Sequence, residues 1–261
     1  MKIYDWKLKK INKEKISMLT CYDYTFAKIL NQTKIDALLV GDSSSMVIHG
    51  DDNTIGSTVE NLAQMCASVV KGAKTKFIVC DLPFGFAFQS KDSFVDGIKL
   101  IMSSGAHAVK IEGVDGLEDK ISMLIQMGVP VMGHLGLTPQ SIQKFGGFKV
   151  QGKSDESKKE IFKSAQKLEA LGAFSVVLEC VPSDLAEAIS KELSIPTIGI
   201  GAGVNVDGQI LVLHDFLGLT DFKAKFVRQY MKAGELVKSA VDHYVDDVNS
   251  VQFPNSEETY L

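Results

Sequence analysis

The chain has 261 residues, of which 45% are hydrophobic and 23% charged, and its formal net charge is −4. This balance suits a soluble protein with a sizeable core, and it lacks the basic excess typical of nucleic-acid binding. No stretch approaches the roughly 20 apolar residues of a membrane span, and the first 15 residues lack the apolar run of a secretory signal, so the cytoplasm is the expected location.

Short apolar segments recur along the chain. Six have the length and composition of strands that are buried on both faces, which is typical of parallel sheets. They lie at residues 36–43, 76–83, 107–113, 129–136, 174–182 and 195–203. Two weaker segments, at residues 17–23 and 209–215, complete a set of eight.

Stretches long enough for helices separate several of these strands, at residues 59–71, 92–103, 116–127, 157–171 and 182–193. Gly72, Gly105, Gly128 and Gly172 follow four of the helical stretches and are predicted to be C-caps, where glycine tolerates a left-handed backbone. Eight strand–helix units in a chain of this length indicate an α/β fold, the (β/α)8 TIM barrel. A doubly wound open sheet uses similar units and is the alternative.

We expect a single barrel domain over residues 1–261. Its last part contains a helical segment at about 223–249 with an incomplete apolar face, which either closes the barrel's end or packs on another subunit. The tail at residues 252–261 is expected to be mobile.

A polar or ionisable residue ends most of the predicted strands. These residues are Asp42, Asp81, Glu112, His134 and Glu179. A hydrophobic core explains the apolar runs, but it does not explain a charge at the same end of each run. Because the catalytic groups of TIM barrels lie at the C-terminal ends of the strands, we expect these side chains to meet in one site.

Residues 107–113 indicate in which direction the charged side chains point. Side chains alternate along a strand, so Ala108, Lys110 and Glu112 share one face while Val109 and Ile111 share the other. If the apolar pair packs on the helices, Lys110 and Glu112 point into the barrel mouth. The alternative is a buried ion pair that closes the barrel, although such pairs often add little stability.

Asp42 and Asp81 end neighbouring strands and are expected to share a cation. Two hard oxygen ligands without sulfur suit Mg²⁺, which keeps positions open for water and substrate. Glu112 is a candidate third ligand, or it holds a metal-bound water. The alternative for each aspartate is a helix N-cap.

Glu179 is the best candidate for a general base. It follows Val176, Val177 and Leu178, an apolar environment that is expected to raise a carboxylate's pKa. Its alternative role is to pair with Lys110. His134 either moves a proton or orients a neighbour, and the sequence favours neither role. The glycine-rich residues 146–152 are predicted to form a mobile loop over the site, or else an ordinary connection.

Eight motifs stand in order between about residues 17 and 215: TCYDY (20–24), VGDS (40–43), DLPF (81–84), VKIEG (109–113), GHLGLTPQ (133–140), GGFKVQG (146–152), LECVP (178–182) and GIGAG (199–203). Each motif alone is weak, but their combination is specific. Together they resemble the ketopantoate hydroxymethyltransferase family.

The resemblance implies a (β/α)8 barrel that holds Mg²⁺ at Asp42 and Asp81, with Glu112 nearby and Glu179 as the base. It implies that the α-keto acid contacts four residues: Asp42, Ser43, Asp81 and Lys110. We add His134 to these substrate-binding candidates from its place at a strand end. The family forms a decamer of pentameric rings, so a homodecamer is expected.

The family transfers a one-carbon unit from 5,10-methylenetetrahydrofolate to 3-methyl-2-oxobutanoate, giving 2-dehydropantoate on the route to pantothenate. Removal of the proton beside the ketone leaves an enolate, which a cation chelated by the keto acid would stabilise. Lys110 would neutralise the substrate carboxylate or enolate oxygen, and Ser43 would donate a hydrogen bond.

Two other functions remain open at this point. A carbon–carbon lyase of the phosphoenolpyruvate mutase and isocitrate lyase kind would use the same acids for enolate chemistry. A noncatalytic barrel that binds a carboxylate metabolite would show binding without turnover. Dependence on folate separates the first alternative from the transferase, and turnover separates the second.

Overall fold

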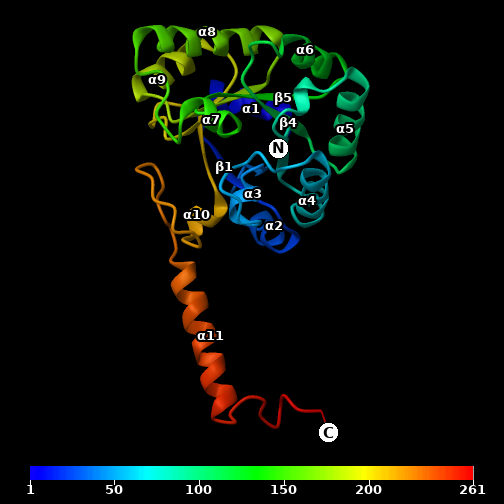
Figure 1. Cartoon of the computed structure of the whole chain (residues 1–261), viewed down its shortest axis with the longest axis vertical. Coiled ribbons are helices and arrows are strands. Elements are labelled where there is room, and N and C mark those ends of the chain that lie inside the picture. Colours follow the sequence, from blue (N-terminus) through cyan, green and yellow to red (C-terminus); the bar gives the residue numbers. More distant parts are fainter. Residues whose placement is uncertain (261) are drawn as a thin grey trace. The chain divides into compact units, whose positions relative to one another are not determined.

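The computed structural model describes residues 1–260, so that Leu261 of the predicted tail lies outside the described residues. The chain divides into two compact units, Met1–Val212 and Leu213–Leu261. In the first unit eight parallel strands pair in chain order, and β1 pairs with β8 to close a barrel (Figure 1). The predicted TIM barrel is therefore confirmed, and the open sheet is excluded.

The strands match the eight predicted segments in order. They are β1 (Ile16–Thr20), β2 (Ala37–Val40), β3 (Phe77–Asp81), β4 (Ala108–Glu112), β5 (Val131–Gly136), β6 (Ser175–Glu179), β7 (Thr197–Ile200) and β8 (Gly208–Leu211). The last predicted strand was too long, because Leu213 already begins a helix.

Helices precede and connect the strands. They are α1 (Ile3–Ile11), α2 (Tyr24–Asn31), α3 (Ser44–Val47), α4 (Val59–Gly72), η1 (Phe86–Phe88), α5 (Lys91–Ser103), α6 (Glu118–Gln126), η2 (Pro139–Ser141), α7 (Ile142–Phe145), α8 (Asp155–Leu171) and α9 (Ser183–Glu192). Residues 201–207 join β7 to β8 without a helix. No helix within residues 1–260 is long and apolar enough to cross a membrane.

Three of the four predicted glycine caps are confirmed. Gly105, Gly128 and Gly172 have φ values of 98°, 78° and 101°. The prediction is wrong for Gly72, which is the last residue of α4 and has no left-handed backbone. A Cβ atom there would lie 2.6 Å from the carbonyl oxygen of Tyr24, so glycine lets α2 and α4 pack closely.

Apolar side chains fill the barrel below its polar strand ends. The interior includes Met18, Leu39, Val79, Ala108, Met132, Val177, Ile198 and Ile210. Trp6 of α1 is fully buried and packs edge-on against Phe77 and Phe174, at the ends where β3 and β6 begin. Helix α1 therefore closes the end of the barrel opposite the polar groups.

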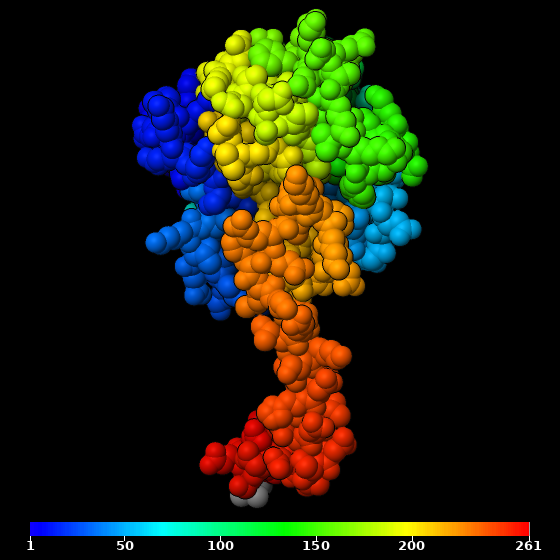
Figure 2. All heavy atoms as spheres, turned by 90° about the vertical axis from the view of Figure 1, so that its left-hand side faces the viewer, coloured from blue at the N-terminus to red at the C-terminus, as the bar shows by residue number. Residues whose placement is uncertain are grey.

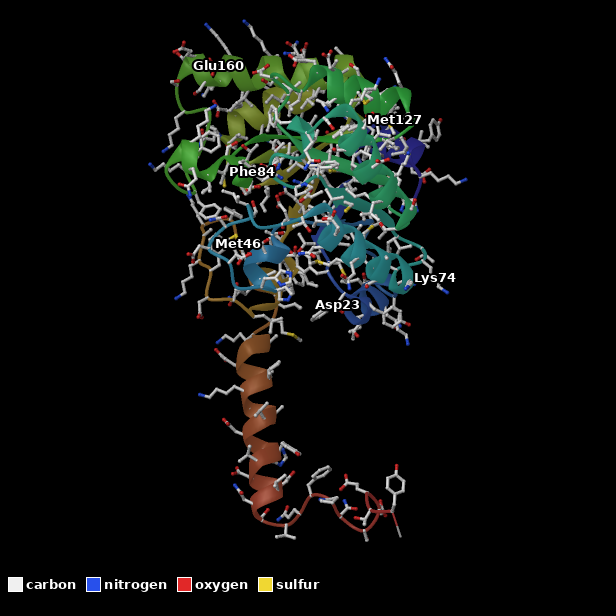
Figure 3. The ribbon with its side chains drawn as sticks, turned by 45° about the vertical axis from the view of Figure 1, so that its right-hand side comes forward. Asp23, Met46, Lys74, Phe84, Met127 and Glu160 are labelled. Atoms are coloured by element: carbon white, nitrogen blue, oxygen red, sulfur yellow. The ribbon has the colours of Figure 1, made fainter. Side chains whose placement is uncertain are left out.

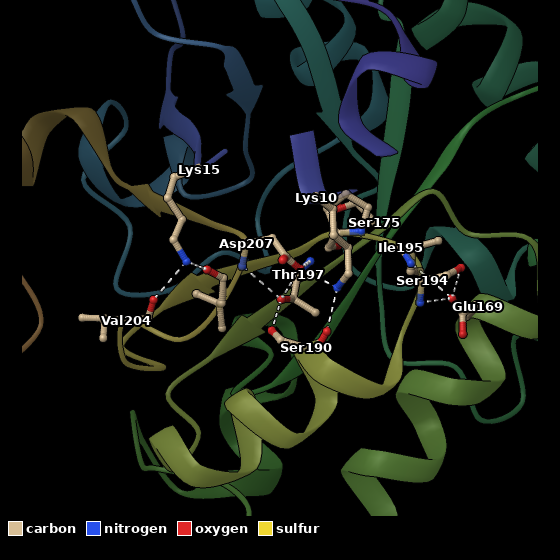
Figure 4. A network of polar contacts seen from close by, with 12 residues as sticks. Lys10, Lys15, Glu169, Ser175, Ser190, Ser194, Ile195, Thr197, Val204 and Asp207 are labelled. Atoms are coloured by element: carbon tan, nitrogen blue, oxygen red, sulfur yellow. Dashed lines mark hydrogen bonds and ion pairs between the residues drawn. The ribbon is translucent and has the colours of Figure 1, made fainter. Parts of the chain in front are cut away.

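A polar network fixes α1 to the barrel (Figure 4). The Lys10 ammonium lies 2.7 Å from Asp207 Oδ2 and also donates to the carbonyl oxygen of Ser190. The same Asp207 oxygen accepts hydrogen bonds from the backbone and hydroxyl of Thr197 on β7. This network stabilises the end of the barrel at which the strands begin.

The second unit, drawn in orange to red in Figure 2, contains α10 (Leu213–Leu217) and α11 (Ala233–Asn249). The predicted helix over residues 223–249 begins only at Ala233. Tyr230, within the non-helical part, donates its backbone N–H to Phe216 of α10 and stacks on that ring at 4.6 Å. These contacts hold the residues before Ala233 outside the helix, whereas the single barrel domain stays a prediction.

Candidate active site

The strand-end side chains come together at one end of the barrel. Asp81, Glu112 and Glu179 are the last residues of their strands, His134 lies in β5, and Asp42 follows β2. In Figure 3, Met46 and Phe84 mark segments that follow strands, and Lys74 and Met127 mark segments that precede strands. The two pairs of labels lie on opposite sides of the barrel. The site therefore lies on the side of Met46 and Phe84.

Asp42 and Asp81 are in direct contact. The Asp42 backbone N–H donates to Asp81 Oδ2 at 3.0 Å, and both residues are buried. Neither aspartate caps a helix, because Ser43 takes the N-cap position of α3 and Gly85 that of η1. The N-cap alternative is therefore wrong for this pair.

Lys110 points into the site from β4, on the same face as Ala108 and Glu112, as the alternation predicts. Its Nζ lies 3.0 Å from Asp81 Oδ1 and 3.8 Å from Glu112 Oε1. Burial opposes the charge of this amine, but the carboxylates of Asp81, Glu112 and Asp42 hold the pKa of Lys110 above its ordinary value. Lys110 is therefore a buried ammonium ion.

His134 stands between two carboxylates. Nδ1 lies 3.3 Å from Glu112 Oε1, and Nε2 lies 3.2 Å from Glu179 Oε2. Burial and the nearby ammonium of Lys110 oppose a charge on the ring, yet the two glutamates raise the pKa of His134 to about 9. The ring therefore lies between Glu112 and Glu179, and its Nδ1 is also 3.1 Å from the Lys110 ammonium.

The surroundings of Glu179 differ from the prediction. Its carboxylate faces the His134 ring, so the apolar run Val176-Val177-Leu178 does not by itself describe its environment. Its ion-pair partner among the described residues is His134 and not Lys110, so the alternative role of Glu179 is also wrong. The buried Nε2 of His134 lies 3.2 Å from Glu179 Oε2, without the geometry of a hydrogen bond.

The site holds more acidic than basic side chains. Burial, with the charges of Asp81 and Glu112, raises the pKa of Asp42 well above its usual range, and burial also raises that of Asp81. Burial opposes the charge on Glu112 too, but His134 and Lys110 hold its pKa below the ordinary value. Four acidic side chains, including Glu179, thus lie around Lys110 and His134.

The aspartates fit a divalent cation. Asp81 Oδ1 and Glu112 Oε1 are buried without a hydrogen-bond partner, since their contacts with the neighbouring cations lack hydrogen-bond geometry. Within residues 1–260, no three His, Cys, Asp or Glu side chains are already arranged as a metal cage. The adjoining carboxylates of Asp42 and Asp81 suit Mg²⁺, which is commonly held by one or two carboxylates and completes its shell with water and substrate.

Two side chains at the site were not predicted from the sequence. Tyr22, which follows β1, lies with its hydroxyl 2.9 Å from the Ser43 hydroxyl. Alternation from Met18 was the signal that could have placed Tyr22 inside the barrel. Gln140 donates from its side chain to Asp42, a contact between residues 98 positions apart that no local pattern reveals.

The glycine-rich residues 146–152 belong to the segment between β5 and α8. This segment begins beside Asp42 at Gln140, and its far end returns to β6, where the Gln151 N–H donates to the Cys180 carbonyl at 2.8 Å. Both ends therefore reach the site, whereas the mobility of the segment stays a prediction.

Comparisons with known proteins agree on one family. A model of the ketopantoate hydroxymethyltransferase family matches residues 1–256. The 3-methyl-2-oxobutanoate hydroxymethyltransferase of Francisella tularensis subsp. novicida is 49% identical over 99% of this chain and 98% of its own. The protein of the same name from Legionella pneumophila is 48% identical over 100% of both chains.

Solved structures share the fold at low identity. Phosphonopyruvate hydrolase in complex with oxalate and Mg²⁺ has a TM-score of 0.64 and 11% identity, covering 99% of this chain and 93% of its own. A 2,3-dimethylmalate lyase of the PEP mutase/isocitrate lyase superfamily has a TM-score of 0.65 and 14% identity, covering 98% and 88%. These likenesses support the barrel architecture.

Proposed function

This chain belongs to the ketopantoate hydroxymethyltransferase family, and we propose that it transfers a hydroxymethyl unit from 5,10-methylenetetrahydrofolate to 3-methyl-2-oxobutanoate. The product is 2-dehydropantoate, in pantothenate biosynthesis. The observation that carries the proposal is the cluster of buried carboxylates facing Lys110 and His134 at the mouth of the barrel. Such a cluster suits a keto acid whose neighbouring C–H bond must be ionised.

The reaction balances with a proton, a methylene group and a water molecule. Glu179 takes the proton from the carbon beside the ketone, and that carbon forms a bond to the methylene group of the folate. Both C–N bonds of the methylene group break, and water supplies the hydroxyl oxygen of the product. The proton taken up by Glu179 and the remaining proton of water end on the two nitrogens of the departing tetrahydrofolate. His134 orients the Glu179 carboxylate for the first step, which the 3.2 Å contact supports.

The proposed cofactor is Mg²⁺, held by Asp42 and Asp81. When bound, this ion supplies positive charge opposite the ketone and carboxylate oxygens of the keto acid. The contact between the two buried aspartates and the buried, unpartnered Oδ1 of Asp81 support the assignment. Glu112 contacts His134 and accepts from the backbone N–H of Gln140. Its proposed role is either a third ligand or a partner that holds a metal-bound water.

Lys110 and Ser43 bind the keto acid. The buried ammonium of Lys110 neutralises the substrate carboxylate or the enolate oxygen, because its strong charge is little screened there. Ser43 donates a hydrogen bond to the substrate carboxylate, and Tyr22 fixes the position of its hydroxyl. The ring of His134 lies beside both Lys110 and Glu179, which supports its place among the substrate-binding residues.

The proposed assembly is a homodecamer in the cytoplasm, as the family resemblance implies. In the single chain α11 exposes a row of apolar side chains: Leu236, Val237, Val241, Tyr244, Val245 and Val248. An exposed apolar face of this kind supports packing on another subunit over closure of the barrel. Light scattering should give a mass ten times that of the 28.4 kDa chain.

Product analysis tests the transferase. The protein is incubated with Mg²⁺, 3-methyl-2-oxobutanoate and a folate donor labelled with ¹³C in its methylene group. The label should appear in the hydroxymethyl carbon of 2-dehydropantoate, and only when the donor is present. Cleavage of a keto acid without folate would favour the lyase, and binding without turnover would favour the noncatalytic barrel.

A further inference from the structure

Gln140 connects three parts of the site. It lies in η2, just after β5, and its side-chain Nε2 donates to Asp42 Oδ2 at 2.8 Å and to the Leu82 carbonyl oxygen at 2.8 Å. Its backbone N–H donates to Glu112 Oε2 at 3.0 Å. A single residue therefore joins the ends of β2 and β4 to the segment that follows β3.

The chemistry of the amide fixes its orientation. A primary amide has two N–H hydrogens, and here both have an acceptor. Turning the group over would place its carbonyl oxygen against a carboxylate and another carbonyl, which is repulsive. The side chain of Gln140 is therefore held in one orientation by Asp42 and Leu82 together.

Asp42 depends on this contact. The amide of Gln140 donates to Oδ2 of the buried Asp42 carboxylate, whereas the Lys110 ammonium lies against Asp81. A neutral amide orients the carboxylate without cancelling its charge, whereas a lysine in the same place would compete with a cation.

We propose that Gln140 is a positioning residue that presents Asp42 to the divalent ion, with the carboxylate oriented by the amide bond to Oδ2. This role rests on the metal site of the proposed function. It also connects the segment between β5 and α8 to that site, because the residue that orients Asp42 belongs to this segment. Partners that orient a metal ligand are typically worth 10–100-fold in metal affinity.

Titration with Mn²⁺, followed by electron paramagnetic resonance without substrate, tests the role, with Mg²⁺ as competitor. Gln140→Met keeps the length of the side chain and removes both donors. Gln143→Met is the matched control, because Gln143 is an exposed residue of α7 in the same segment. Gln140→Met should raise the Kd for Mn²⁺ by roughly 10–100-fold, and Gln143→Met should leave it unchanged.

Two further readouts separate positioning from a loss of structure. Gln140→Met should still unfold in one cooperative transition in EDTA, at a midpoint somewhat below that of the wild type because Asp42 and Leu82 lose a donor, and saturating Mg²⁺ should restore most of its kcat. If Gln140→Met does not fold, Gln140→Asn replaces it, since the shorter amide cannot reach both acceptors. Equal Mn²⁺ affinity in variant and wild type would overturn the role of Gln140 alone. Absence of Mn²⁺ binding by the wild type would overturn the metal site as well.

Discussion

Lys110 is the residue on which the charge balance of the site depends. Its ammonium is buried, lies 3.0 Å from Asp81 and faces Glu112 and His134. Burying this charge is costly, so the pair with Asp81 contributes little net stability. Removing one partner is far worse, because it leaves a buried charge without compensation.

We therefore expect Lys110→Met to lower the free energy of unfolding by about 3–5 kcal/mol at pH 7 in EDTA. Mg²⁺ should restore part of this loss, because the ion replaces positive charge beside Asp81. Urea unfolding with and without Mg²⁺ measures both effects. The control is Lys99→Met, which removes an exposed pair with Asp96 and should change stability by less than about 1 kcal/mol. Equal effects of the two substitutions would contradict the expectation.

The residues that the sequence predicted are those at strand ends. Asp81, Glu112 and Glu179 stand directly after apolar runs, so the rule for TIM barrels places them without any knowledge of tertiary contacts. Gln140 has no such pattern, because its role depends on partners brought together only by closure of the barrel. The contact between His134 and Glu179 was missed for the same reason, and with it the polar surroundings of the base.

At the scale of elements, the paired ends of β5 and β6 position the base. Gly136 pairs with Glu179, and its φ of 90° lies in the left-handed region. A Cβ atom at this position would lie 2.2 Å from the Glu179 carbonyl oxygen and 2.6 Å from a side-chain atom of Val181. Backbone atoms cannot move aside without shifting the strand that carries Glu179.

Gly136→Ala should therefore both destabilise the protein and lower kcat. The control is Gly128→Ala, where φ is 78° but no atom lies within 4 Å of the new methyl group. That substitution should cost only the strain of a left-handed alanine, about 1–2 kcal/mol, and should not change kcat. Thermal unfolding and steady-state kinetics of both variants measure these effects. An unchanged kcat in Gly136→Ala would contradict the claim that the paired ends of β5 and β6 position Glu179.

Periodicity predicted the elements of the barrel well, because buried parallel strands and amphipathic helices carry strong patterns. Periodicity gave wrong predictions where tertiary contacts determine the local structure. The segment after α10 has apolar residues at helical spacing, but the ring of Tyr230 stacks on Phe216 and the helix begins at Ala233. Gly72 looked like a cap, yet it serves the close approach of α2 and α4.

At the scale of the whole molecule, the two ends of the barrel have different roles: one end is closed by packing, and the other carries the charged groups. Helix α1 with Trp6 closes one end by apolar packing and the Lys10–Asp207 network, and the charged groups gather at the other end. Eight strand–helix units made this architecture predictable. The proposed decamer was not predictable from composition or periodicity, since an exposed apolar helix face does not specify its partner.

Proton exchange at the keto acid tests the central claim most directly. The protein, Mg²⁺ and 3-methyl-2-oxobutanoate are mixed in heavy water without folate, and the proton signal beside the ketone is followed by NMR. The wild type should lose this signal, and Glu179→Gln should slow the loss by roughly 10²–10⁴-fold. Glu187→Gln, which alters a partly exposed glutamate of α9 paired with Lys191, should behave as the wild type. Exchange at the wild-type rate in Glu179→Gln, or none in the wild type, would contradict the assignment of Glu179 as the base.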